Sequence, residues 1–122
     1  MRIASVVARI LLGLVFTLAG VAAFVFTPPA QPGLAGAFAE VFYRSHWAQF
    51  LGAAQIVMGL CFLTNRLVPI ALCILGGFLY NSFAFHLTMA PAGLAAPIIA
   101  LGLGVVVAWP YRQRLHLLLA AC

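Results

Sequence analysis

Four long apolar stretches constrain this chain more than any other feature. They cover about residues 3–26, 47–64, 67–87 and 92–109. Each approaches the roughly 20 apolar residues that a helix needs to cross a bilayer core. Two-thirds of all residues are apolar and only 6% are charged, against about 25% charged residues in soluble domains. The sequence therefore predicts an all-α integral membrane four-helix bundle that forms one domain over residues 1–122.

The segments between these stretches differ in character. Residues 27–33 contain three prolines, which exclude a helix there. The next stretch, 34–43, predicts a short interfacial helix that leads into the second span. Residues 64–66 form a tight turn, so the second and third spans are expected to be antiparallel neighbours. The apolar run over 10–26 exceeds the usual core of a signal peptide, so the first stretch is expected to be a retained span.

The positive charges indicate how the bundle is oriented. All six cations are arginines: Arg2, Arg9, Arg44, Arg66, Arg112 and Arg114. With four spans, every arginine except Arg44 falls on one side. The positive-inside rule then predicts that both termini and the turn at 64–66 are cytoplasmic. The arginines lie at the ends of apolar runs and do not form one patch, which argues against nucleic-acid binding.

Polar side chains within the spans are the candidates for chemistry, because they are costly in a membrane. Asn81 and His86 lie toward the outer end of the third span, and we expect them to line an outward-facing pocket as catalytic and cofactor-binding residues. Gln55, Glu40 and His46 are expected to contribute to the same pocket. It would hold a quinone head group, since an imidazole exchanges protons near neutral pH. The alternative is that these side chains hydrogen-bond between helices.

Other chemistries find little support in the sequence. One acidic residue cannot supply a Ser/His/Asp set or paired carboxylates. Haem binding by His46 and His86 is a weaker alternative to quinone binding. No metal site is predicted, because Cys61, Cys73 and Cys122 form no CxxC pair and are interpreted as packing residues.

Small residues predict where helices approach closely. Gly13 and Gly20 recur seven residues apart in the first span, as do Gly52 and Gly59 in the second. The fourth span carries a small residue at every fourth position. These residues are Ala92, Ala96, Ala100, Gly104 and Ala108. This seam is a hypothetical docking face for a partner membrane protein, a redox protein or another copy of the chain.

Three segments together resemble a known family. They are Arg9–Phe16 with Ala19-Gly20, Gly52–Leu60, and Asn81 through Phe85-His86 followed by Ala90-Pro91-Ala92-Gly93. The chain is similar along nearly its whole length to the DoxX-like family of small four-helix membrane proteins. The resemblance implies a multi-pass protein of the bacterial inner membrane that is linked to redox complexes. It also implies that Asn81 and His86 match the family's polar signature.

Two functions are expected from these observations. The first is a membrane subunit of a quinone-linked redox system with an outward-facing polar pocket. The alternative is a non-catalytic anchor or stabilising subunit for a partner protein. A third hypothesis is a transporter for a small solute. The lack of a buried charge pair argues against an ion-coupled transporter.

Overall fold

The computed structural model describes residues 2–121, and they are almost entirely helical. In chain order the elements are α1 (Arg2–Val25), α2 (Gly33–Arg44), α3 (Trp47–Thr64), α4 (Val68–Thr88), the 3₁₀ turn η1 (Pro91–Gly93), α5 (Ala95–Ala108), η2 (Trp109–Tyr111) and α6 (Arg112–Ala120). Four helices are long and apolar enough to cross a membrane: α1, α3, α4 and the continuous run from Pro91 to Ala120. These four helices indicate a multi-pass membrane protein and confirm the predicted number of spans.

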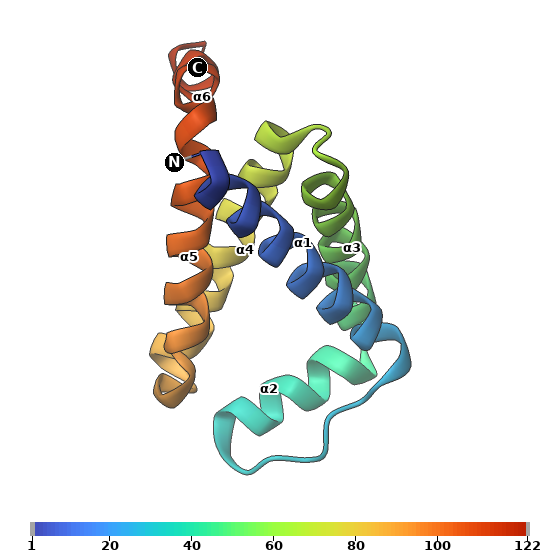
Figure 1. Ribbon diagram of the computed structural model, residues 1–122. Coiled ribbons are helices and arrows are strands. Elements are labelled where there is room, and N and C mark those ends of the chain that lie inside the picture. The colour runs from blue at the N-terminus through green and yellow to red at the C-terminus, as the bar shows by residue number, and fades with distance from the viewer. Residues whose placement is uncertain (1, 122) are drawn as a thin grey trace.

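The helices are arranged so that the two ends of the bundle differ (Figure 1). The start of α1, the turn between α3 and α4, and α6 all lie at one end. The helix α2 lies across the opposite end, below the diverging ends of α3 and α4. We call the end with α6 the α6 end and the other the α2 end. A helix over the predicted range 34–43 is therefore confirmed, and it runs across the direction of the long helices.

The closest contact in the bundle joins α1 to α3 through glycines. Gly20 of α1 faces Gly52 of α3, and a Cβ atom added to Gly20 would lie 2.5 Å from the Gly52 carbonyl oxygen. One heptad along, a Cβ added to Gly59 would lie 2.8 Å from the Gly13 carbonyl oxygen. A Cβ added to the other glycine of each pair would likewise crowd the carbonyl oxygen of its partner. This is expected for antiparallel helices whose backbones touch. The glycines in the sequence indicate close helix packing, and the structure shows that the two pairs pack against each other.

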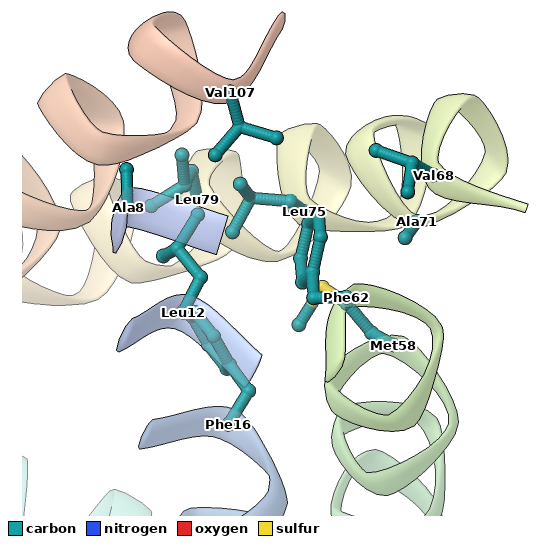
Figure 2. Close-up of a cluster of buried hydrophobic side chains, with 10 residues drawn as sticks. All are labelled: Ala8, Leu12, Phe16, Met58, Phe62, Val68, Ala71, Leu75, Leu79 and Val107. Atoms are coloured by element: carbon teal, nitrogen blue, oxygen red, sulfur yellow. The ribbon is translucent and has the colours of Figure 1, made fainter. Parts of the chain in front are cut away.

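The buried core lies nearer the α6 end, where α1, α3, α4 and α5 converge (Figure 2). Leu12 of α1, Phe62 of α3, Leu75 of α4 and Val107 of α5 are all almost completely buried there. The complete buried cluster is Ala8, Leu12, Phe16, Met58, Phe62, Val68, Ala71, Leu75, Leu79 and Val107. Much of the remaining apolar surface is exposed, which is typical of a bundle whose solvent is lipid.

The fourth span differs from its prediction in two respects. A 3₁₀ turn at Pro91–Gly93 precedes α5, and the helix continues through η2 into α6 instead of ending near residue 109. The small-residue seam also faces partly inward. Gly104 is buried against Leu75, since a Cβ there would lie 2.9 Å from Leu75 Cδ2, and Ala100 packs against the core. The middle of the seam is therefore used within the bundle and is not a free docking face.

The C-terminal end of α3 is capped by its own turn and by α1. Asn65 adopts a left-handed conformation with φ 56°, and the Arg66 amide donates to the Cys61 carbonyl at 3.1 Å, as in a Schellman motif. The Arg9 guanidinium of α1 donates to the carbonyl of Phe62 and, at 3.4 Å, to that of Leu63. This satisfies carbonyls that a helix end leaves without partners.

Candidate functional site at the α2 end

A row of aromatic rings links α2 to its neighbours at the α2 end. Phe38 and Phe42 lie one turn apart on α2, with ring centroids 5.8 Å apart. Phe38 contacts Phe85 of α4 at 5.4 Å, and Phe42 contacts Trp47 of α3 at 6.1 Å. One face of α2 therefore binds both α3 and α4 through ring contacts.

His86 extends this row and is held in a defined orientation. Its ring lies 5.1 Å from Phe85 in an edge-to-face arrangement. Its Nδ1 atom lies 3.1 Å from the Ala90 carbonyl oxygen. Because a carbonyl can only accept, Nδ1 carries a hydrogen, and Nε2 of the neutral ring is an acceptor. The ring also covers Gly93, where an added Cβ would collide with it. His86 thus closes the turn between α4 and α5 and keeps one nitrogen for another partner.

Asn81 lies on a different side of α4. Its side chain is exposed, and its amide nitrogen donates to the Gly77 carbonyl of the same helix at 2.9 Å. Residues 81 and 86 are five apart, which places them about 140° around an ideal helix. The structure therefore does not bring Asn81 and His86 together.

Glu40 faces away from the aromatic row. Its carboxylate accepts a hydrogen bond from Arg44 at 3.0 Å in an exposed ion pair. Together with Tyr43 and Arg44 it lines an open hollow of about 460 Å³ between α2 and the loop at residues 27–33. Phe38 is two residues from Glu40 and so lies on the other face of α2.

The remaining two predicted site residues lie in separate places. His46 is exposed in the left-handed turn between α2 and α3, with φ 64°. Gln55 is half-buried within α3. Of the predicted set, only His86 lies within the aromatic row. The five predicted residues therefore do not form one pocket.

Sequence reasoning missed the residues that surround His86. The spacing of Phe38 and Phe42, four apart in a predicted interfacial helix, was the available signal. Thr17 Oγ1 and Gln49 Oε1 are buried without a hydrogen-bond partner among the described residues, a property that the sequence alone does not reveal. A Cβ added to Gly59 would collide with Thr17 Oγ1, so the hydroxyl lies at the close crossing of α1 and α3.

Among residues 2–121, no three His, Cys, Asp or Glu side chains are grouped so that they could hold a metal ion. Cys61 is half-buried against the core, Cys73 is exposed, and both are free thiols; Cys122 lies outside the described residues. The chain matches no family model, no curated protein and no solved structure.

Proposed function

We propose that this protein is a membrane subunit of a quinone-linked redox system, and that it binds a quinone head group beside His86. The observation that carries the proposal is the fixed imidazole. Nδ1 is held by the Ala90 carbonyl, which leaves Nε2 to accept a hydrogen bond from a quinol hydroxyl. The Phe85 ring lies 5.1 Å from the imidazole, and the Phe38 ring follows at 5.4 Å from Phe85. A planar head group packs well against aromatic rings.

In this proposal, proton transfer belongs to this chain and electron transfer to a partner protein. A quinol that is oxidised to the quinone releases two protons and two electrons. His86 would take up one proton, the second would pass to water at the membrane surface, and both electrons would pass to a redox protein that this chain accompanies. The resemblance to the DoxX-like family supports the same role in the bacterial inner membrane. We further propose that the α6 end is cytoplasmic, since it carries every arginine except Arg44. That places α2 and His86 at the outer surface, with α2 in the interfacial layer.

Quinone binding can be measured by quenching of Trp47. The chain has two tryptophans, so a Trp109→Phe background leaves Trp47 as the only one, and its ring contacts the aromatic row through Phe42. The protein in nanodiscs is titrated with short-chain ubiquinone and menaquinone analogues. We expect saturable quenching that His86→Phe weakens by about 10-fold or more, equivalent to one lost hydrogen bond to a desolvated group.

Two further variants separate a direct role of His86 from a general disturbance. Gly93→Ala keeps the imidazole but displaces its ring, and should weaken binding as well. His116→Phe changes a histidine at the opposite end and should have no effect. Absence of saturable quenching, or quenching that His86→Phe leaves unchanged, would exclude the proposed site.

The alternative function, a non-catalytic anchor for a partner, is favoured by one separate observation. Asn81 exposes a polar group on the outside of the bundle, where a neighbouring protein could bind it. Both functions predict a protein that co-purifies after gentle solubilisation, so the two are distinguished by combining this purification with the quinone titration. An anchor retains a stoichiometric partner and fails to bind quinone.

A further inference from the structure

One face of α4 is exposed along its whole length. We define the α4 stripe as Ile70, Cys73, Gly77, Tyr80, Ala84 and Leu87, all of which are exposed. Their spacing alternates between three and four residues, the pattern of a helix that packs along a left-handed seam. Among the described residues, no other helix covers this stripe.

Asn81 lies beside the α4 stripe and is unsuited to lipid. It is three residues from the midpoint of α4, hence about 4.5 Å from it along the axis, well inside a bilayer core roughly 30 Å thick. A carboxamide offers two N–H donors and an acceptor oxygen, and its single hydrogen bond within residues 2–121 goes to Gly77. Hydrocarbon cannot satisfy the remaining groups, so Asn81 requires a polar partner from outside the bundle.

The backbone next to Asn81 is also not covered by another helix. A Cβ added to Gly76 or Gly77 would have no atom within 4 Å. In α1 and α3 the glycines lie at contacts between helices, whereas this pair faces outward. An adjoining helix could therefore approach α4 here as closely as α3 approaches α1, and its polar groups could reach the Asn81 carboxamide.

We propose that the α4 stripe is the interface between two copies of this chain. Both copies have the same orientation in a membrane, so a twofold axis relating them runs along the membrane normal. Each residue on the seam then lies at the same depth as its counterpart. Asn81, which flanks the seam, then lies beside the exposed Gly76 and Gly77 backbone of the other copy and can donate to its carbonyl groups. The twofold axis makes this contact twice. The stripe contains no charge that would oppose self-association.

Cys73 provides a direct test, because it lies on the proposed seam and faces its own counterpart. In a chain with Cys61→Ala and Cys122→Ala, Cys73 is the only thiol. Copper-catalysed air oxidation of membranes should link two such chains through a Cys73 disulfide. A control chain in which Cys73→Ala is combined with Val105→Cys carries its single thiol on an exposed position of α5. Cross-linking of Cys73 that does not exceed this control would overturn the proposal.

Variants at Asn81 and Gly77 test whether the seam itself causes the cross-link. Asn81→Leu should lower the dimer association constant by about 3- to 30-fold, the range for a polar side chain between membrane helices. Asn81→Gln should retain much of it. Gly77→Ile has open space in one copy but would block a second, and should abolish the cross-link. Gly102→Ile is its matched control, since Gly102 of α5 also has nothing within 4 Å.

Folding of each variant is checked by its thermal unfolding midpoint in detergent, which none of these changes should lower appreciably. If Asn81→Leu and Gly77→Ile cross-link as well as the parent while remaining folded, the α4 stripe is not the interface. If a different protein is captured at Cys73 and no second copy is, the proposal of a homodimer is likewise wrong.

Discussion

Arg9 shows how one side chain can differ from what its position in the sequence predicts. The sequence indicates an anchor that orients the first span. In the structure its guanidinium is partly buried and donates to carbonyls in the last turn of α3. A cation also offsets the partial negative charge at a helix C-terminus. Arg9 therefore stabilises the contact between α1 and α3 in addition to contributing positive charge.

Replacement of Arg9 by leucine should destabilise the bundle. The change leaves the last carbonyls of α3 with one donor fewer, and hydrogen bonds to a charged group are worth about 1.5–3 kcal/mol. We expect the free energy of unfolding in detergent to fall by about that amount. Arg2→Leu is the control, because Arg2 is exposed at the start of α1. Equal stability of the two variants would show that the contacts of Arg9 contribute little.

The sequence selects candidate site residues one at a time, but it does not predict how they are arranged. Polarity within an apolar span is the reason for selecting Asn81 and His86, and the structure places them on different sides of α4. Their separation follows from helix geometry, because five residues turn the chain about 140°, and only a distorted helix could reunite them. The partners of His86 come from α2 and from the turn after α4. No sequence spacing encodes such contacts, since they depend on how the helices pack.

At the scale of the helices, sequence periodicity was most informative where backbones touch. The pairs at 13 and 20 and at 52 and 59 predicted a close contact, and the structure places them opposite one another. The small residues of α5 had the same spacing, yet Gly104 faces Leu75 inside the bundle. Four-residue spacing defines a face of a helix but not the neighbour that covers it.

The α1–α3 contact predicts opposite effects for two glycine-to-alanine changes. Alanine normally stabilises a helix by about 0.5–1 kcal/mol relative to glycine. At Gly102, where nothing lies within 4 Å, that gain should appear as a higher unfolding midpoint. At Gly52 the new methyl group would lie 2.8 Å from Ala23 Cβ and from the Gly20 carbonyl. Overpacking of this kind costs about 1–3 kcal/mol, so the midpoint should fall.

Helix boundaries illustrate which parts of the fold the sequence determines. Residues 47–64 form α3 as predicted, and α1 and α4 agree with their predictions within a residue or so. Apolar length and turn residues act locally, which explains this accuracy. The fourth span is the exception, because its apolar run predicts an end near Trp109. The structure accommodates Pro110 in a 3₁₀ turn, η2, and the chain continues as α6.

At the scale of the whole molecule, the two ends of the bundle differ both in structure and in positive charge. The α6 end gathers the start of α1, the α3–α4 turn and the C-terminal helix, and every arginine except Arg44 belongs to those elements. At this end Tyr111 donates to the Asn65 side chain at 3.4 Å, and the Arg112 guanidinium lies 5.0 Å from the Trp109 ring centroid. Aromatic and cationic side chains combined in this way are typical of an interfacial anchor.

This asymmetry predicts a single orientation, which labelling of introduced thiols can measure. Ala30→Cys, in the exposed loop before α2, should react with a membrane-impermeant maleimide in intact bacterial cells. Gln113→Cys, exposed on α6, should react only after the inner membrane is permeabilised. Both changes are made in chains with alanine at positions 61, 73 and 122. The reverse pattern would place His86 at the cytoplasmic side of the membrane, and labelling of both thiols in intact cells would indicate mixed insertion. Either result would contradict an orientation set by five arginines against one.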